Sequence, residues 1–422
     1  MKTAQYRRRH ARADGGAVAA AAAALPAYDA GVGAGTRASP RLTWVVVLRG
    51  FAAMWVFVYH LWHTLGGVAI DFGFPSGFTL GLRSLFRAGY QGVDLFFVLS
   101  GFVIAWPYVE AAASRMRGAQ VIDFYRRRFF RIAPLYYVTI AVVVILLHFD
   151  WLNGKQNLRI VVAHLLFLEN YVPAWVTTLR GVYWTLPTEM SFYLLFPLLL
   201  PLVDRHRPWR FAAAAIVVAI AYRVGTAWST LHGGVSLAWT SSYLPGRIDQ
   251  FALGMAAACA LATTASPATR PSRARVLAVG LAAILVIVVN GRQDGGFDAW
   301  YALGPSAVAV AIAAFILVLG RYVHAQHREA AAPRGIVAAS AMRLGEASFG
   351  IYLWHTVFID LAVEAARRLS ATPDVRTALV LASVPITIAV ALATWRWIEA
   401  PCIAWSRGLG RAKDVPGLAA LR

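Results

Sequence analysis

The sequence predicts an all-α polytopic membrane protein, and three observations lead to that prediction. Hydrophobic residues make up 59% of the 422 residues and charged residues only 14%, whereas about a quarter of a soluble chain is charged. The mean hydropathy is +0.58. The apolar runs are ~18–22 residues long, the length of a helix that crosses a bilayer, while barrel strands would give short alternating segments.

About ten spans and one shorter apolar segment are expected. The shorter segment, residues 159–173, contains His164 and Glu169, and its length favours a re-entrant or interfacial position. We expect residues 1–41 to form a disordered basic tail, residues 42–403 the membrane domain, and residues 404–422 a C-terminal tail. The predicted spans are residues 43–64, 90–109, 133–149, 184–203, 211–231, 245–264, 276–291, 299–320, 346–367 and 376–398.

The distribution of positive charge predicts the orientation of these spans. A formal net charge of +20 would suggest a nucleic-acid partner for a soluble protein. In a membrane protein, the distribution of Lys and Arg indicates which segments face the cytoplasm. With the N-terminus inside, 28 of the 40 Lys and Arg residues fall in inner segments and 9 in outer loops. The other three, Arg49, Arg223 and Arg247, lie within spans. Both termini are therefore expected to be cytoplasmic.

The first span, "LRGFAAMWVFVYH", carries an arginine and a histidine on one helix face. Arg49 and His60 are eleven residues apart, which is ~16 Å of rise and three turns plus ~20°. Ionisable residues inside spans are rare and usually functional. Arg49 near the inner interface suits an anionic group, and a deeper His60 suits proton transfer. A snorkelling arginine with a structural histidine is the alternative, and His63 competes with His60.

Two further spans carry carboxylates. Asp94 lies in "GVDLFFVLSGF", where the pair Ser100-Gly101 also permits close helix packing. Glu189 lies in "YWTLPTEMSFYLLFP", flanked by Trp184 and Tyr193. A buried carboxylate can act as an acid or a base, or it can orient a histidine. The alternatives are an interfacial position for Asp94 and a helix N-terminal position, favoured by the helix dipole, for Glu189.

An arginine cluster, "DFYRRRFFRIAPLYY", precedes the predicted third span on the inner side. Arg128 and Arg131, at positions i and i+3, share a helix face. Guanidinium groups bind phosphate bidentately, so a coenzyme A moiety or a nucleotide would fit. Ordinary positive-inside anchoring is the alternative.

The remaining polar positions are less specific. Arg247 and Asp249 begin the sixth span and either pair with each other or face the substrate. His355 lies in the ninth span in "FGIYLWH", and Glu399 in "WRWIEAP" is expected to cap the structure. The two cysteines suggest neither a disulfide framework nor a metal cluster. The sequence contains no Gly-rich phosphate loop, zinc-protease motif or nucleophile elbow.

Six of these segments, in this order, resemble the membrane-bound acyltransferase-3 family, which includes bacterial glycan and macrolide O-acyltransferases. They are "LRGFAAMWVFVYH", "GVDLFFVLSGF", "FYRRRFFRIAPLYY", "WTLPTEMSFY", "YLWH" and "WIEAP". The resemblance covers residues ~42–403. Arg49 and His60 match the family's first-span Arg and His, which favours His60 over His63. Many members have an aspartate where this chain has Val46, which leaves the charge partner of Arg49 open.

The inner Arg-x-x-Arg of the family matches Arg128 and Arg131, and its fourth-motif glutamate matches Glu189. The resemblance implies a multi-pass enzyme of the bacterial plasma (inner) membrane that works among membrane lipids. Such an enzyme transfers an acyl group, often acetyl, from cytosolic acyl-CoA to a hydroxyl of an envelope glycan, glycolipid or macrolide. Neither a metal nor a nucleic acid is expected.

The expected site has three groups of residues. The catalytic group is His60, Glu189 and Asp94; the donor-binding group is Arg49, Arg128 and Arg131; the substrate-binding group is Trp184, Tyr193, Arg247, Asp249 and His355. The arginines would hold the phosphates of coenzyme A. His60 would accept the acyl group or deprotonate the acceptor, and one of the two carboxylates would fix its tautomer.

Two other functions fit the composition. A proton-coupled exporter of a glycolipid or small molecule also needs intramembrane His, Glu, Asp and Arg. The cytosolic arginine pair and the lack of an internal repeat disfavour it. A non-catalytic scaffold in envelope-glycan assembly would leave the buried charges unexplained.

Overall fold

A computed structural model of the chain describes residues 42–67, 71–73, 79–147, 151, 154–233, 243–264, 270–291, 299–326 and 335–411. The predicted N-terminal tail, residues 1–41, lies outside the described residues, as do residues 412–422. Helix α16 (Ala400–Arg411) continues past residue 403. The first part of the predicted C-terminal tail is therefore helical.

The described residues contain nine helical segments that are long and apolar enough to cross a membrane. A tenth apolar helix, α10 (Ile248–Thr264), is slightly shorter. These ten segments match the ten predicted spans and confirm an all-α polytopic membrane protein. The nine longer segments contain the helices α2 (Thr43–Thr64), α4 (Gly92–Glu110), α5 (Gly118–Leu147), α7 (Thr185–Leu199), α8 (Pro208–Leu231), α11 (Arg273–Asn290), α12 (Ala299–Gln326), α14 (Ser348–Arg368) and α15 (Pro373–Thr394).

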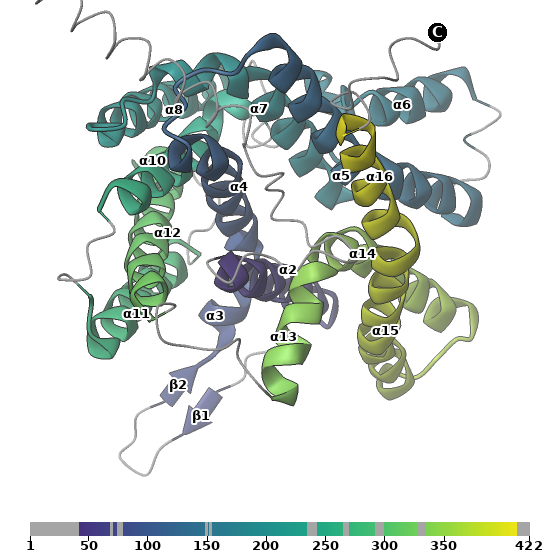
Figure 1. Ribbon diagram of the computed structural model, residues 1–422. Helices are drawn as coiled ribbons and strands as arrows, with labels where there is room; N and C mark the ends of the chain where they lie inside the picture. Colours follow the sequence, from purple (N-terminus) through teal and green to yellow (C-terminus); the bar gives the residue numbers. More distant parts are fainter. Residues whose placement is uncertain are drawn as a thin grey trace, which may run out of the picture.

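Short elements connect the spans. A two-stranded antiparallel hairpin follows α2 and projects from the helical body (Figure 1). A π-helical segment joins α15 to α16. The short elements are β1 (Asp71–Gly73), β2 (Thr79–Gly81), α3 (Arg83–Arg87), η2 (Ala88–Gln91), α6 (Lys155–Leu165), η4 (Glu169–Tyr171), η5 (Pro173–Trp175), η6 (Gly181–Trp184), η7 (Leu200–Leu202), η8 (Leu244–Gly246), α13 (Ile336–Glu346) and η10 (Trp395–Glu399).

The segment predicted to be re-entrant or interfacial folds as α6, η4 and η5, which are too short to cross a bilayer. A buried hydrogen-bond network ties it to α5. The Tyr136 hydroxyl donates to Glu169 Oε1 at 3.0 Å and lies 3.0 Å from His164 Nδ1. His164 Nε2 lies 3.0 Å from the Thr178 hydroxyl. His164 and Glu169 therefore bind each other and Tyr136 of α5.

Helix α5 begins fifteen residues before the predicted span at residues 133–149. The arginine cluster therefore lies within a long membrane helix rather than in a loop before it. The helix continues because residues 118–132 contain apolar positions such as Phe124 and Ile132, which are buried against the bundle. Pro134 sits in the helix interior, where its missing N–H removes one backbone hydrogen bond.

Helix α13 was not predicted as a helix. It crosses α2 where two glycines meet: a Cβ atom on Gly50 would lie 2.8 Å from Gly345 N, and one on Gly345 would lie 2.1 Å from Val46 O. This contact brings the two backbones together at the turn of α2 that carries Arg49.

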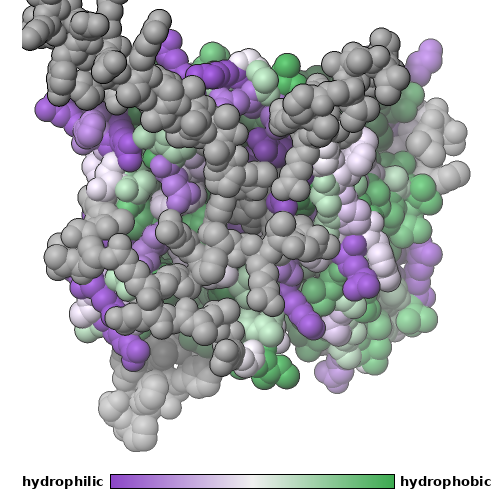
Figure 2. All heavy atoms as spheres, viewed as in Figure 1, coloured by the Kyte–Doolittle hydropathy of each residue, from purple (hydrophilic) through white to green (hydrophobic). Residues whose placement is uncertain are grey.

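Hydrophobic side chains cover much of the outer surface. Figure 2 shows them gathered on the right-hand side of the view, in the region of α5 and α15. Exposed examples on these helices are Ile145, Leu146, Leu381 and Ile386. Contiguous apolar surface of this kind fits contact with lipid rather than with water.

The core is built around α4, which has the largest buried share of the candidate spans. Helix α10 packs against it backbone to backbone. A Cβ atom on Gly101 would lie 2.1 Å from Phe251 O, and one on Gly254 would lie 2.0 Å from Val98 O. The prediction that Gly101 permits close helix packing is confirmed, because no side chain fits at this crossing.

We expect Gly254→Ala to destabilise the protein by about 1–3 kcal/mol, since the added methyl overlaps the backbone of α4 and the helices must separate. The matched control is Gly225→Ala on α8, where a Cβ meets nothing within 4 Å. Alanine there is expected to stabilise the helix by up to about 1 kcal/mol. Thermal unfolding in detergent would measure both changes, and equal changes would contradict the packing argument.

Candidate functional site

A buried cavity between α2, α4, α5, α7 and α14 gathers five of the eleven predicted site residues. A second cavity shares part of this lining and extends to Tyr352 of α14. The polar residues that line the first cavity are Arg49, Ser100, Arg128, Arg131, Glu189 and Tyr193. The sequence predicted five of these six, and the fold brings them together from four helices.

Glu189 is the hydrogen-bond acceptor of this cavity. The Ser100 hydroxyl donates to Glu189 Oε1 at 2.6 Å, and the Tyr193 hydroxyl donates to the same oxygen at 2.5 Å. Arg49 interacts electrostatically with Glu189 and with Glu399. These two carboxylates place negative charge near Arg49, while the neighbouring Arg131 places positive charge there.

Arg131 pairs with a carboxylate from the other end of the chain. Its Nη1 donates to Glu399 Oε2 at 2.8 Å, and the two side chains are only 8% and 1% exposed. The guanidinium also lies 5.8 Å from the Phe349 ring centroid and 5.5 Å from that of Trp395. Glu399 ends the π-helical segment, a distortion that often marks functional positions. Glu399, which was expected to cap the structure, is the buried counterion of Arg131.

The third arginine, Arg128, lies beside aromatic rings. Its guanidinium is 5.6 Å from the Phe124 ring centroid and 5.7 Å from that of Tyr193, which is within the range of cation–π attraction. With every group ionised, the three arginines and the carboxylates of Glu189 and Glu399 leave one net positive charge. In surroundings of low dielectric constant, such a set attracts anions more strongly than the same charges would in water.

A pair of histidines lies beyond the second cavity. His60 Nδ1 is 3.2 Å from His355 Nε2, and the ring centroids are 4.9 Å apart. His60 Nδ1 is also 3.0 Å from Val56 O, and His355 Nδ1 is 3.2 Å from Ile351 O. His355 is fully buried. The structure therefore places His355, which was expected to bind substrate, directly against His60.

Tyr352 lies between the second cavity and the histidine pair. Its ring centroid is 5.8 Å from that of His355 and 5.8 Å from that of Phe96. Its hydroxyl donates to Val182 O at 2.8 Å and accepts a hydrogen bond from Thr185 at 3.1 Å. The arginine-lined cavity and the histidine pair are thus neighbouring compartments, with aromatic side chains between them.

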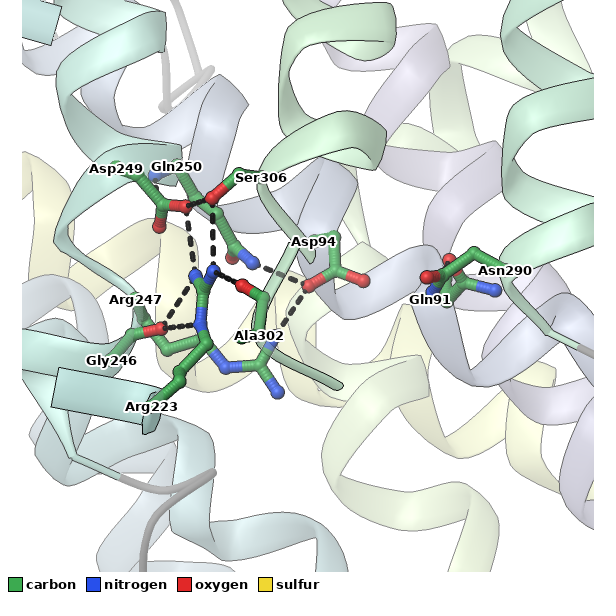
Figure 3. A network of polar contacts seen from close by, with 10 residues as sticks. All are labelled: Gln91, Asp94, Arg223, Gly246, Arg247, Asp249, Gln250, Asn290, Ala302 and Ser306. Carbon is green, nitrogen blue, oxygen red and sulfur yellow. Dashed lines mark hydrogen bonds and ion pairs between the residues drawn. The ribbon is translucent and has the colours of Figure 1, made fainter. Parts of the chain in front are cut away.

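The carboxylate of Asp94 does not belong to the histidine pair. Its Oδ1 accepts hydrogen bonds from Arg247 and from Gln250, both at 2.7 Å (Figure 3). Glu189 is bound to Ser100 and Tyr193 instead. Within the part of the chain that the structure describes, neither carboxylate hydrogen-bonds His60. The expectation that one of them fixes the tautomer of His60 is therefore wrong, since both are committed to other partners.

Arg247 and Asp249 do not pair with each other. Arg247 binds Asp94, and its guanidinium lies 5.4 Å from the Trp184 ring centroid. Asp249 binds Arg223 at 2.8 Å. These residues, expected to bind substrate, instead join α4, α8 and α10 through buried charges (Figure 3).

Tyr193 was also expected to bind substrate, and it lies in the arginine-lined cavity. The sequence gave Ser100 only a role in close helix packing beside Gly101, and it gave Glu399 and His355 other roles. All three occur in the quoted segments "GVDLFFVLSGF", "WIEAP" and "YLWH". Among the described residues, no three His, Cys, Asp or Glu side chains form a metal-binding group.

Fold and site together define a polytopic α-helical membrane protein with a buried, arginine-lined cavity beside a histidine pair. The chain belongs to the acyltransferase-3 family: the family model, described as an acyltransferase domain, matches residues 42–396. This membership makes the protein a membrane-bound transferase of acyl groups.

Several characterised proteins are similar over most of the chain. Acyltransferase MdmB of Streptomyces mycarofaciens is 29% identical over 400 residues, which cover 89% of this chain and 94% of the relative. Exopolysaccharide production protein ExoZ of Rhizobium meliloti is 27% identical and covers 79% of this chain and 96% of its own length. Peptidoglycan O-acetyltransferase OatA of Listeria monocytogenes is 26% identical over 84% of this chain and 54% of the relative. No solved structure matches the chain.

Proposed function

We propose that this protein transfers an acyl group, acetyl or another short acyl such as succinyl, from cytosolic acyl-CoA to a hydroxyl of an envelope glycan, glycolipid or macrolide. The observation that carries the proposal is the cavity in which Arg49, Arg128 and Arg131 meet next to the His60–His355 pair. Membership of an acyltransferase family supports a transferase and does not favour the exporter alternative.

The arginines suit the phosphates of the donor. Guanidinium groups bind phosphate oxygens through paired hydrogen bonds, and the buried setting strengthens that attraction. Arg131 already binds Glu399, so a phosphate that approaches Arg131 competes with this carboxylate. Lys and Arg are in excess in the segments on the same side of the membrane as Arg49. This excess supports a cytosolic location for the arginine-lined cavity, in a bacterial plasma membrane with both termini inside.

His60 suits the transfer step. About 16 Å of helix rise separates it from Arg49, so the thioester of a donor bound at the arginines would extend toward the histidine pair past Tyr352. His60 takes the proton of the acceptor hydroxyl, the hydroxyl oxygen bonds to the thioester carbonyl carbon, and the carbon–sulfur bond breaks. The proton then passes from His60 to the departing thiolate, which releases coenzyme A as the thiol and restores the neutral imidazole. In the covalent variant, His60 first receives the acyl group and then passes it to the hydroxyl.

The acceptor is the least specified partner. Two relatives carry names that refer to polysaccharide, an exopolysaccharide production protein and a peptidoglycan O-acetyltransferase. These names support a glycan hydroxyl as the first acceptor class to test.

We expect Arg128→Ala to raise the KM for acyl-CoA by roughly 10- to 100-fold, because a charge-assisted hydrogen bond contributes about 1.5–3 kcal/mol. The measurement is turnover of labelled acetyl-CoA by the protein in liposomes. The matched control is Arg127→Ala, one residue away on α5. Arg127 pairs with Asp123 at 3.6 Å and is not among the residues that line the cavity.

The control is expected to change the KM less than threefold. A wild-type protein that neither binds nor turns over acyl-CoA, across several acyl chains and acceptors, would overturn the proposed function. Equal effects of the two substitutions would remove Arg128 from the donor site.

A further inference from the structure

The contacts of His60 and His355 determine where their protons lie. Each Nδ1 faces a carbonyl oxygen one helical turn earlier on its own helix: His60 Nδ1 is 3.0 Å from Val56 O, and His355 Nδ1 is 3.2 Å from Ile351 O. His355 Nε2 points across to His60 Nδ1 at 3.2 Å. Three contacts therefore constrain two neutral imidazole rings, each of which has one N–H and one lone pair.

Only one arrangement of protons satisfies all three contacts. If both rings carry hydrogen on Nδ1, His355 donates to Ile351 O and its Nε2 lone pair accepts, while His60 Nδ1–H is shared between Val56 O and His355 Nε2. In the opposite arrangement, His355 Nε2–H donates to His60, and both Nδ1 lone pairs then face carbonyl oxygens. That arrangement keeps one hydrogen bond and creates two repulsive contacts, so the first is preferred.

We propose that His355 is a positioning residue whose Nε2 accepts a hydrogen from His60 Nδ1 and so keeps the lone pair of His60 on Nε2. This inference rests on the proposed function for its catalytic meaning, since Nε2 is then the atom that accepts the proton or the acyl group. His355 takes the orienting place that a carboxylate occupies in many hydrolytic triads. As a neutral acceptor buried at 0% exposure, it adds no charge to the membrane interior.

Two observations support a dedicated role for His355. Its ring is held on several sides, with the Phe57 ring centroid at 5.5 Å, that of Tyr352 at 5.8 Å and that of His60 at 4.9 Å. Val56 O is a helix carbonyl one turn before His60, so it already accepts a backbone N–H. His355 Nε2 is therefore the additional acceptor that holds the shared hydrogen on His60 Nδ1.

The test measures the tautomer directly and separately from activity. The full chain, labelled with 15N-histidine and held in nanodiscs, is examined by NMR, which distinguishes protonated from unprotonated ring nitrogens; His60→Gln identifies the His60 signals. Wild type is compared with His355→Gln, whose side-chain oxygen can still accept, and with His355→Phe, which keeps a ring without an acceptor. We expect a bare Nε2 on His60 in wild type and in His355→Gln, and a mixture of tautomers in His355→Phe.

Acyl transfer is then measured on the same proteins. We expect His355→Phe to lower kcat by roughly 100-fold, the lower part of the range that a positioned base contributes, with the KM for the donor unchanged. His355→Gln is expected to recover most of this loss. A wild-type spectrum with hydrogen on His60 Nε2, or a His355→Phe protein with an unchanged tautomer and kcat, would overturn the proposal. Absence of acyl transfer in wild type would instead refute the proposed function and leave the tautomer result standing.

Discussion

His60→Ala is expected to lower kcat/KM for acyl transfer by roughly 10²–10⁴-fold, the contribution of a positioned acid–base group. The expected loss follows from the position of His60. It is the histidine of α2 that contacts the buried imidazole of His355, and it lies on the face of the helix that also carries Arg49. The measurement is acetyl-CoA turnover in liposomes with a glycan acceptor, and the variant's circular dichroism and detergent stability report whether it folds.

The matched control for this prediction is His63→Ala. His63 lies in the last turn of the same helix and is exposed. Its removal is expected to change kcat/KM less than threefold. If the two alanine variants lose activity equally, the assignment of His60 is wrong; if the His63 variant alone loses activity, the reacting histidine is the one at the end of the helix.

Arg223→Met is expected to reduce the free energy of unfolding by about 3–5 kcal/mol, because it leaves a buried carboxylate without its counterion. Arg223 binds Asp249 at 2.8 Å and also donates to Gly246 O, Ala302 O and the Ser306 hydroxyl (Figure 3). Truncation therefore removes one hydrogen-bond donor from each of four groups at once, and these groups tie η8, α10 and α12 to α8.

A thiol-reactive dye can follow this unfolding in a Cys402→Ser background. Cys259 of α10 is 1% exposed, so it reacts when the packing around α10 opens. The matched control is Arg210→Met on the same helix, an exposed arginine whose loss is expected to change stability by less than about 0.5 kcal/mol. Similar unfolding midpoints for the two variants would show that the buried network does not stabilise the bundle.

The buried charges illustrate where prediction from sequence succeeded and where it could not. Arg49 and Glu189 were identified because a charged residue inside an apolar run is costly and therefore rarely accidental, and Arg128 and Arg131 because their i, i+3 spacing places two guanidinium groups on one helix face. That reasoning needs only local sequence. It also predicted ten spans; nine correspond to helices in the described residues that are long enough to cross a membrane, and the tenth corresponds to the shorter helix α10.

Pairing could not be predicted in the same way. Asp94 binds Arg247 across 153 positions, Arg131 binds Glu399 across 268, and His60 contacts His355 across 295. Local reasoning left Arg247 either to pair with its neighbour Asp249 or to face the substrate, and it gave His60 a carboxylate partner. Arg247 instead binds Asp94 of α4 and Asp249 binds Arg223 of α8, while Glu189, the other carboxylate proposed for His60, binds Ser100.

By itself, the sequence determined the helical membrane class, the spans and the polar residues that lie within them, since bilayer thickness and the cost of buried charge act on each segment separately. The tertiary structure decided which of those residues meet: the arginines with Glu189 around one cavity, Glu399 on Arg131, and His355 on His60. The physical reason is that a buried charge or lone pair is stabilised only by a partner within hydrogen-bond distance. In this bundle, that distance is set by close packing at positions such as Gly254 and Gly345.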